Sequence, residues 1–168
     1  KRAALQRYVR GRRVLNCFSY TGGFSIYAGA AGAKHVTSVD ASARALELAA
    51  EHVKLNGLPP ERFEFVCDDV KNFFAALAQA RERARTGASE DASSAPGPYD
   101  VIILDPPAFV KDRHKVKEGM VGYRRVNEAA LRALPPGGVL VTCSCSGHVS
   151  LQDFRHMLTE CAARAGRT

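Results

Sequence analysis

The stretch Arg13–Asp40 reads RVLNCFSYTGGFSIYAGAAGAKHVTSVD and carries most of the information on the fold. Residues 13–19 are rich in strand formers and predict a buried strand. The glycine-containing turn at 20–23 ends that strand, and the small residues of 24–31 predict a helix. Residues 34–40 then predict a second strand with an acid at its carboxyl end. Strand, turn, helix and strand in this order are typical of a parallel sheet with crossover helices.

The same alternation continues to the end of the chain. We predict a mobile surface loop over residues 84–98, which are small and polar, and a basic loop over Lys111–Gly122. The remaining predicted elements are helix 43–56, strand 62–67, a helix from about 70 to 83, strand 99–105, helix 123–134, strand 139–144 and helix 150–163. The pattern predicts one α/β domain over residues 1–168, with a Rossmann-like, doubly wound and mainly parallel sheet.

The composition limits the class of protein. Apolar residues make up 46% and charged residues 24% of the 168 residues, which favours a globular core over disorder. No apolar run approaches the ~20 residues of a membrane helix, and the chain starts without a secretory signal. Five cysteines without a scaffold spacing predict reduced thiols in a cytoplasmic protein, and we predict no metal site. The missing initial Met predicts a domain cut from a longer protein.

The net charge of +7 is concentrated at the start of the chain. Seven of the 24 basic residues precede Asp40, and no acidic residue does. A polyanion such as RNA would bind such a segment, because phosphate neutralisation supplies most non-specific affinity. A solvated helix face explains the same charges equally well. We also allow for a homodimer, and we expect no membrane partner.

Polar and glycine residues follow the predicted strands, where doubly wound sheets bind their ligands. Gly22 and Gly23 let the backbone approach a ligand, and Asp40 suits a ribose diol, although these residues also serve turns and helix starts. Together they favour an adenosine-containing ligand. The turn lacks the G-x-G-x-x-G spacing that cradles a pyrophosphate, so S-adenosylmethionine is favoured over NAD. The predicted cofactor-binding residues are Phe18, Ser19, Tyr20, Thr21, Gly22, Gly23, Asp40, Ala41, Asp68, Asp69 and Asp105.

The segment Asp105-Pro106-Pro107-Ala108-Phe109 follows the most apolar strand. Its prolines donate no hydrogen bonds, so the turn accepts bonds from a ring nitrogen or an exocyclic amine. Phe109 offers a stacking face for a base. We predict that Pro106, Pro107, Phe109, Lys111 and Tyr123 bind the substrate.

VLNCFSYTGGFS, SVDAS, CDDV, LDPPAFVK and GGVLVTCSCSGH together resemble the ordered motifs of class I methyltransferases, and more narrowly the RlmI-type 23S rRNA cytosine-5 methyltransferases. The resemblance covers nearly the whole chain from about Val9. It implies S-adenosylmethionine as cofactor and 23S rRNA as partner. It also implies an amino-terminal RNA-binding domain and two final strands that this sequence does not include.

The resemblance assigns the chemistry to two residues. Cys145 matches the Ser-Cys-Ser nucleophile of the family and is chosen over Cys143, which has the same strand phase. Its thiolate would add to C6 of cytosine, while Asp105 would hold the N3/N4 edge. Enzymes with a second cysteine carry it after the proline of the fourth strand, where this chain has Ala108. No general base is assigned, and the other cysteines, Cys17, Cys67 and Cys161, are predicted to be buried.

Three alternatives remain at this point. The first is a methyltransferase acting on a purine nitrogen, which needs no thiol. The second is an NAD-dependent oxidoreductase. The third is an RNA-binding module without turnover.

Overall fold

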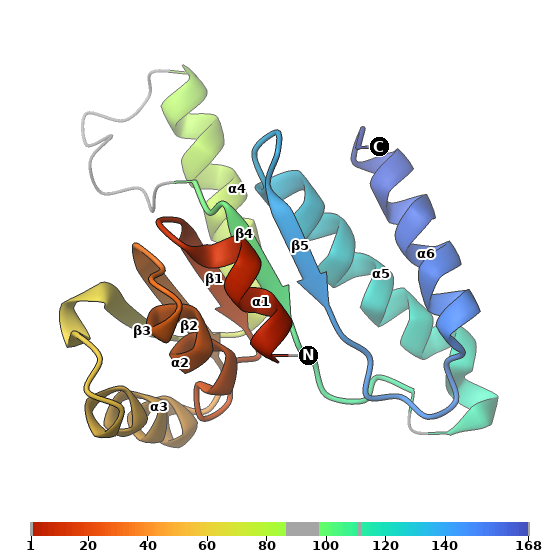
Figure 1. Cartoon of the computed structure of the whole chain (residues 1–168). Coiled ribbons are helices and arrows are strands. Elements are labelled where there is room, and N and C mark those ends of the chain that lie inside the picture. Colours follow the sequence, from red (N-terminus) through yellow and green to blue (C-terminus); the bar gives the residue numbers. More distant parts are fainter. Residues whose placement is uncertain (1, 87–97, 111, 168) are drawn as a thin grey trace.

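The computed structural model describes residues 2–86, 98–110 and 112–167 (Figure 1). Its helices and strands are α1 (Arg2–Val9), β1 (Arg13–Cys17), α2 (Gly23–Ala30), β2 (His35–Asp40), α3 (Ala43–Leu55), β3 (Phe63–Cys67), α4 (Val70–Thr86), β4 (Val101–Leu104), α5 (Val116–Ala133), β5 (Val139–Thr142) and α6 (Leu151–Arg164). The sheet has the order β3-β2-β1-β4-β5, and all neighbouring strands are parallel. The predicted doubly wound α/β fold is confirmed.

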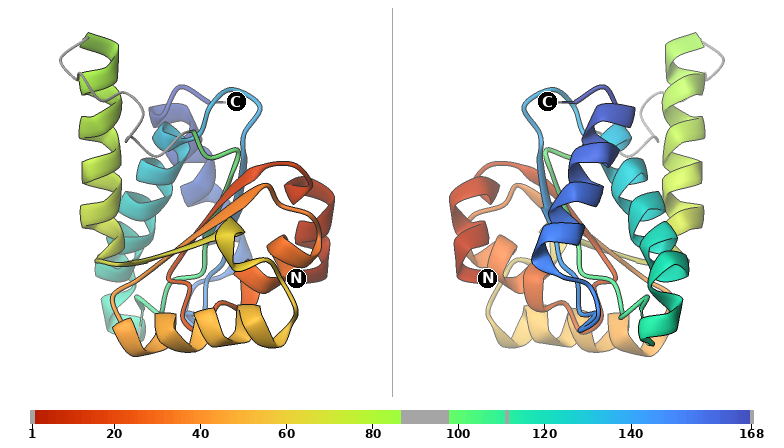
Figure 2. Two further views of the ribbon diagram at one scale, coloured as in Figure 1. Left: turned by 90° about the vertical axis from the view of Figure 1, so that its left-hand side faces the viewer. Right: turned by 90° about the vertical axis from the view of Figure 1, so that its right-hand side faces the viewer.

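The three central strands, β2, β1 and β4, are buried because their side chains alternate between two apolar cores. Leu15 and Ile102 pack with residues of α4 and α5 on one face of the sheet. Val14 and Ile103 pack with residues of α1, α2 and α3 on the other face. The side views in Figure 2 show the sheet between these two helical layers. The continuous apolar run of β4 is therefore explained by burial on both faces.

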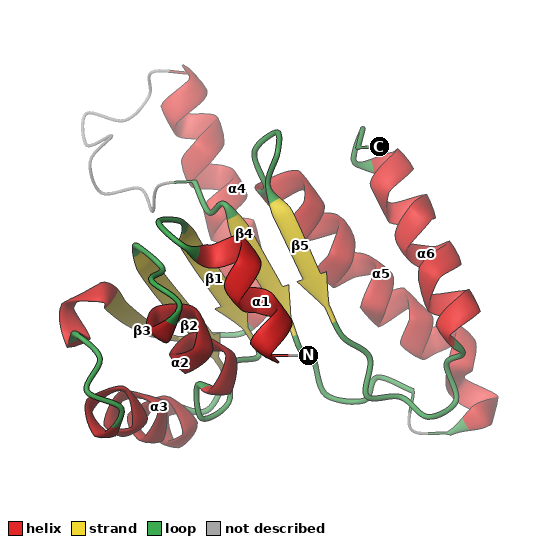
Figure 3. Ribbon diagram, in the orientation of Figure 1, coloured by secondary structure: helices red, strands yellow, loops and turns green. Residues whose placement is uncertain are grey.

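The carboxyl ends of the strands meet at one edge of the sheet, which carries the loops drawn below the arrowheads in Figure 3. The strand order reverses between β1 and β4. The chain adds β2 and β3 on one side of β1, and then β4 and β5 on the other side. Such a reversal is the place where open α/β sheets bind ligands. The fold thus brings together the turns that follow β1, β2, β3, β4 and β5.

A polar network anchors α2 to the first two strands just inside this edge. The Asn16 amide donates to Ser25 Oγ at 2.9 Å, and Ser25 Oγ lies 2.7 Å from Ser38 Oγ. All three side chains are buried, and Asn16 pairs with Ser38 in the β1–β2 register. Buried polar groups that are paired in this way fix one arrangement of the surrounding elements. The start of α2 is therefore held in register with both strand ends.

Two of the predicted loops are wrong in part. Residues 84–86 belong to α4, which extends to Thr86. Residues 87–97 of the predicted loop lie outside the described residues, and Pro98 belongs to neither a helix nor a strand. The predicted basic loop at 111–122 is mostly helical, with a 3₁₀ turn at Arg113–Lys115 and α5 from Val116 onward.

Two glycines explain why α5 reads as a loop in the sequence. A Cβ atom on Gly119 would lie 2.7 Å from the Phe109 carbonyl oxygen, and one on Gly122 would lie 3.2 Å from the Phe109 ring. Glycine is unfavourable in an isolated helix but allows this close approach. Tertiary packing therefore decides the structure here. The structure also contains α1, a helix that the sequence analysis did not predict.

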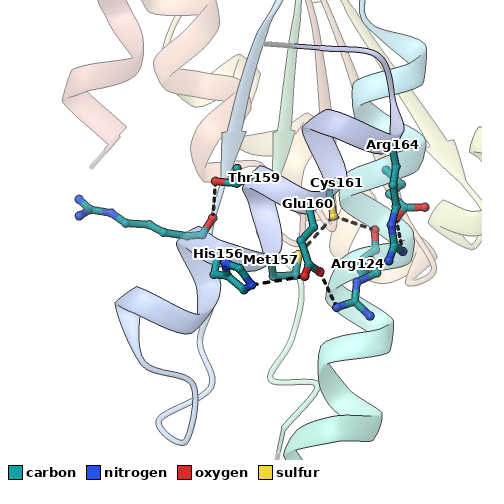
Figure 4. Close-up of polar contacts among 9 residues, drawn as sticks. Arg124, His156, Met157, Thr159, Glu160, Cys161 and Arg164 are labelled. Carbon is teal, nitrogen blue, oxygen red and sulfur yellow. Dashed lines mark hydrogen bonds and ion pairs between the residues drawn. The ribbon is translucent and has the colours of Figure 1, made fainter.

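Helix α6 lies against α5 at the side of the sheet next to β5. Glu160 accepts a hydrogen bond from the Arg124 guanidinium at 3.0 Å and lies 3.3 Å from His156 Nε2 (Figure 4). Buried Cys161 and Met157 contact each other beneath these charges. Among the described residues, no helix combines the length and apolar character that crossing a membrane requires.

Candidate active site

The turn after β1 has an unusual backbone. Phe18 has a φ of 57°, Tyr20 a φ of 47° and Gly22 a φ of 79°, so three alternate residues are left-handed. For residues with a Cβ this conformation is uncommon and costs on the order of 1 kcal/mol each. Strain of this kind persists only where the surroundings hold the backbone, and it gathers at ligand sites.

Backbone hydrogen bonds hold this turn against β2. The Ser19 N–H donates to the Val39 carbonyl at 3.1 Å, and the Tyr20 N–H donates to Asp40 Oδ2 at 2.8 Å. Asp40 Oδ1 accepts from the Ser42 N–H at 2.9 Å. A carboxylate offers about four acceptor positions, so each oxygen of Asp40 keeps one for a ligand. The position fits the predicted ribose contact.

Helix α3 supports the turn from outside. A Cβ on Gly22 would lie 2.9 Å from the Ala49 Cβ, so only glycine fits there. His52 Nδ1 lies 3.0 Å from the carbonyl oxygen of Thr21. Nothing in the sequence pattern distinguishes His52, because its contact depends on how α3 packs against the turn.

Ser19 provides a test of whether the turn fits a cofactor. Its side chain is buried, and Ser19 Oγ has no hydrogen-bond partner in the described part of the chain. Buried polar atoms are almost always paired, so an unpaired hydroxyl in this turn fits a missing ligand atom. Together with the open acceptor positions of Asp40, it fits an adenosine-containing ligand.

The turn after β3 contributes two carboxylates with different surroundings. Asp69 Oδ1 accepts from the Lys71 N–H in the first turn of α4, which is a helix-capping contact. Asp68 is half-buried, and its Oδ1 accepts from the Asp69 N–H and from Asn72. Asp68 is thus the better placed of the two for a ligand. Cys67 was predicted to be buried, which is wrong, because its side chain is exposed where β3 ends.

The turns after β4 and β5 bring the two predicted catalytic residues together. Sγ of the exposed Cys145 lies 3.9 Å from Oδ1 of the half-buried Asp105, although the residues are 40 positions apart. The strand phase predicted for the two cysteines is wrong, because β5 ends at Thr142. Cys143 packs instead beside the α1–α2 core. Only Cys145 of this pair is exposed beside Asp105.

The proline turn after Asp105 leads to an aromatic contact between the two parts of the site. Pro106 is buried and Pro107 is exposed. The half-buried Phe109 ring meets the Phe18 ring edge to face at 6.3 Å between centroids. The segment that follows β4 therefore touches the turn that follows β1. Lys111 lies outside the described residues.

Tyr123, which was predicted to bind the substrate, is not exposed. It lies on α5 and is fully buried, so its ring offers no surface to a base. Arg124 on the same helix is half-buried and forms an ion pair with Glu160. Among the side chains that the structure describes in this region, Lys115, Lys117 and Arg125 are the exposed lysines and arginines.

A separate groove of about 450 Å³ lies between α4 and α5. Its walls are mostly apolar, with Phe74 and Val126 among them, and every lining residue belongs to one of the two helices. None of the predicted site residues lines it. The site at the strand ends is therefore distinct from this groove.

The parallel sheet with its strained first turn, an acid at the end of β2 and a D-P-P turn after β4 defines a class I methyltransferase-like protein. The chain belongs to the S-adenosylmethionine-dependent methyltransferase family, whose model matches residues 1–167. S-adenosylmethionine is accordingly its cofactor, and the alternative of an NAD-dependent enzyme is set aside.

Individual relatives agree with this assignment. The chain is 42% identical over 166 residues to the ribosomal RNA large subunit methyltransferase I of Klebsiella pneumoniae strain 342, covering 99% of this chain and 38% of that protein. The chain thus spans about two fifths of the length of its curated relatives. Among solved structures, SMU.776 in complex with S-adenosylhomocysteine has a TM-score of 0.74 and 27% identity, covering 96% of this chain and 38% of that one. The S-adenosylmethionine-dependent methyltransferase from Agrobacterium tumefaciens has a TM-score of 0.66 and 28% identity, with coverage of 95% and 47%.

Proposed function

We propose that this chain is the catalytic core of an RNA methyltransferase that modifies C5 of a cytidine in 23S rRNA. The observation that carries the proposal is the 3.9 Å distance between Cys145 Sγ and Asp105 Oδ1 at the carboxyl edge of the sheet. The name of the Klebsiella relative supports large-subunit ribosomal RNA as the substrate. The exposed thiol favours cytosine over a purine, because methylation of a purine nitrogen needs no nucleophile from the protein.

Cytosine C5 is a poor nucleophile, so the base must first be activated. The Cys145 thiolate would form a bond to C6, and the electron pair of the C5–C6 double bond would move to make C5 nucleophilic. S-adenosylmethionine, when bound, would supply an electrophilic methyl group to which C5 can bond, with S-adenosylhomocysteine as the leaving group. Loss of the C5 proton to a base and release of the thiolate from C6 would then restore the aromatic ring.

Asp105 would orient the base during this sequence. A carboxyl group close to Cys145 can pair with the N3/N4 edge and supply a proton to N3 as the thiolate adds. The adjacent turn supports this role, because its prolines donate no competing hydrogen bonds. Phe109 would pack against the base, while Pro106 and Pro107 shape the turn.

The exposed cations near the start of α5 would bind the flanking phosphates. Lys115 and Lys117 are exposed on the 3₁₀ turn and the first turn of α5, which follow the D-P-P segment, whereas Arg125 lines the groove between α4 and α5. A flipped-out base brings its neighbouring phosphates close to the rim of the active site. Affinity for RNA should therefore fall steeply as salt increases.

The proposal is tested by trapping the covalent adduct. Incubation with S-adenosylmethionine and 23S rRNA fragments carrying 5-fluorocytidine should give a protein–RNA complex that survives denaturation, because fluorine at C5 prevents release of the enzyme. Cys145→Ala should abolish this complex. Cys67→Ala, which removes another exposed thiol, should retain it.

Other outcomes identify the alternatives. Methyl transfer that continues in Cys145→Ala refutes cytosine chemistry and supports methylation of a purine nitrogen. Binding of RNA with a steep salt dependence but without any methyl transfer, in the unmodified chain saturated with S-adenosylmethionine, refutes the catalytic role and supports an RNA-binding module.

A further inference from the structure

The two serines on either side of Cys145 make contacts that the reaction itself does not require. Ser144 Oγ donates to the phenol oxygen of Tyr123 at 3.1 Å, and Ser146 Oγ lies 2.8 Å from the same oxygen. The Ser146 N–H also donates to Ser144 Oγ at 3.3 Å. We refer to Tyr123, Ser144 and Ser146 as the hydroxyl triad. Its bonds close a ring around the backbone that carries Cys145.

The hydrogen bonds of the hydroxyl triad can all be donated in the same direction around the ring. Because Ser144 donates its proton to the Tyr123 oxygen, the phenol proton is left for Ser146 Oγ. Ser146 Oγ accepts a second bond, from the Val110 N–H at 3.1 Å. The triad thus ties the loop after β5 to the segment that starts at Asp105. These are the two segments that must keep Cys145 and Asp105 close together.

The Tyr123 ring is held in place on two sides. It meets Phe109 at 4.8 Å and Phe154 of α6 at 5.5 Å between centroids, both edge to face. The close approach of α5 to Phe109 needs the glycines at 119 and 122. A buried, closely packed ring loses little entropy when its hydroxyl forms hydrogen bonds. The packing therefore fixes the position of the Tyr123 hydroxyl to which Ser144 and Ser146 bond.

We propose that Tyr123 is a positioning residue for Cys145. Its hydroxyl sets the backbone of Ser144-Cys145-Ser146 so that Cys145 Sγ faces Asp105. This role rests on the proposed function of Cys145, and it gives Tyr123 a task different from the base contact expected from the sequence. The Tyr123 hydroxyl is hydrogen-bonded to Ser144 and Ser146, on either side of Cys145, and these bonds do not involve Cys145 Sγ or the Asp105 carboxylate.

The test replaces the phenol alone. Tyr123→Phe keeps the ring packing and removes the hydroxyl, so kcat should fall about tenfold, while KM for S-adenosylmethionine should change less than twofold. Tyr99→Phe is the matched control, since Tyr99 is another fully buried tyrosine whose hydroxyl bonds Thr37, away from Cys145. The control should leave both constants unchanged.

A second measurement does not depend on turnover. Alkylation by iodoacetamide, followed residue by residue in the mass spectrum, gives the rate at Cys145 relative to exposed Cys67. Tyr123→Phe should change this ratio at least threefold, and Ser146→Ala should change it in the same direction. Tyr99→Phe should not. A role in stability alone would lower the melting temperature without altering the ratio.

The outcomes separate this inference from the proposed function. An unchanged alkylation ratio together with unchanged kcat in Tyr123→Phe overturns the positioning role. If Tyr123→Phe does not fold, Ser144→Ala and Ser146→Ala decide by the same ratio. Full methyl transfer by Cys145→Ala overturns the proposed function and with it any catalytic purpose of the triad, whatever the alkylation ratio shows.

Discussion

The two halves of the site are held in different ways. The cofactor half comprises residues 18–23, Asp40–Ala41 and Asp68–Asp69, and the reaction half comprises residues 105–110 and 143–146. Backbone hydrogen bonds and left-handed residues fix the turn of the cofactor half. Side-chain hydroxyls and aromatic packing against α5 and α6 fix the reaction half.

This difference has a consequence for mutations. In the cofactor half, backbone hydrogen bonds hold the turn that would contact the ligand. Substitutions that move this backbone should therefore alter the affinity for the ligand. A reaction that depends on one thiol and one carboxylate should be sensitive to single functional groups, so substitutions there should alter turnover. The two halves meet at the Phe18–Phe109 contact.

The largest effect is expected from Asp105→Asn. The amide cannot supply a proton to N3, so kcat should fall by about 10²–10⁴-fold, which is the usual contribution of general acid–base catalysis. The affinity for S-adenosylhomocysteine, measured by calorimetry, should change by less than about threefold, since one hydrogen-bond acceptor remains.

Asp40→Asn is the partner experiment in the cofactor half. It should weaken binding of S-adenosylhomocysteine by about tenfold, because a charge-assisted contact is lost. Turnover at saturating S-adenosylmethionine should stay close to that of the unmodified chain. If both variants lose affinity and turnover to the same extent, the division into two halves is wrong.

Gly22→Ala should disrupt the cofactor half through the backbone. The new Cβ would lie 2.9 Å from Ala49 Cβ at a φ of 79°, so strain and overpacking add to about 2–4 kcal/mol. Affinity for S-adenosylhomocysteine should fall at least tenfold, and the melting temperature should fall as well.

Gly11→Ala separates backbone strain from overpacking, the two causes of the effect expected for Gly22→Ala. Gly11 has a φ of 70° with no atom within 4 Å of the added Cβ, so only backbone strain remains. It should lower stability by about 1 kcal/mol and leave the affinity unchanged. Equal losses of affinity in both variants would show that local packing at Gly22 plays no part.

The sequence predicted the cofactor half better than the reaction half, for a physical reason. Residues 13–40 form a local unit in which strand, turn and helix follow one another, so the pattern of apolar and glycine residues reports the structure directly. The positions of β1 and β2 agree with the predicted strands to within two residues at each end. The left-handed conformation of Phe18 and Tyr20, by contrast, depends on contacts with β2 and leaves no signal in the residue type.

The reaction half depends on contacts between distant residues. Gly119 and Gly122 reduce helix propensity, yet packing on Phe109 makes this segment part of α5. The burial of Tyr123 follows from that helix and from α6, so a prediction based on its neighbours in sequence placed it at the surface. The pairing of Cys145 with Asp105 was predicted from the family resemblance, and it agrees with the rule that parallel strands end at a common edge.

His52→Ala should have a smaller effect within the cofactor half. The variant loses the hydrogen bond to the Thr21 carbonyl, worth about 1 kcal/mol, so affinity for S-adenosylhomocysteine should fall about fivefold. kcat should not change. Asn56→Ala is the control, because Asn56 bonds the His52 carbonyl from an exposed position outside the turn. An unchanged affinity in His52→Ala would show that α3 supports the turn through Gly22 alone.

The smallest effect is expected at Cys161, whose thiol is packed in the core between α5 and α6 and has no role in the proposed reaction. Burial, followed by the nearby Glu128 carboxylate, raises the pKa of Cys161 from 9.0 to about 11. Burial also raises the pKa of Cys17. At pH 8, both should react with iodoacetamide far more slowly than the exposed Cys67 and Cys145, since the thiolate is the reactive form.

The raised pKa of Cys161 also predicts how stability depends on pH. Below about pH 9 the thiol is protonated in the folded and unfolded states alike, so it has no effect on the slope. Between about pH 9 and pH 11 the unfolded chain loses this proton first, so stability falls by up to about 1 kcal/mol per pH unit. Cys161→Ala removes this contribution, and its unfolding free energy in urea should fall less steeply over the same range. Parallel curves for the two proteins would mean that the Cys161 thiol ionises as readily in the folded chain as in the unfolded one, which its position between Met157 and Arg124 argues against.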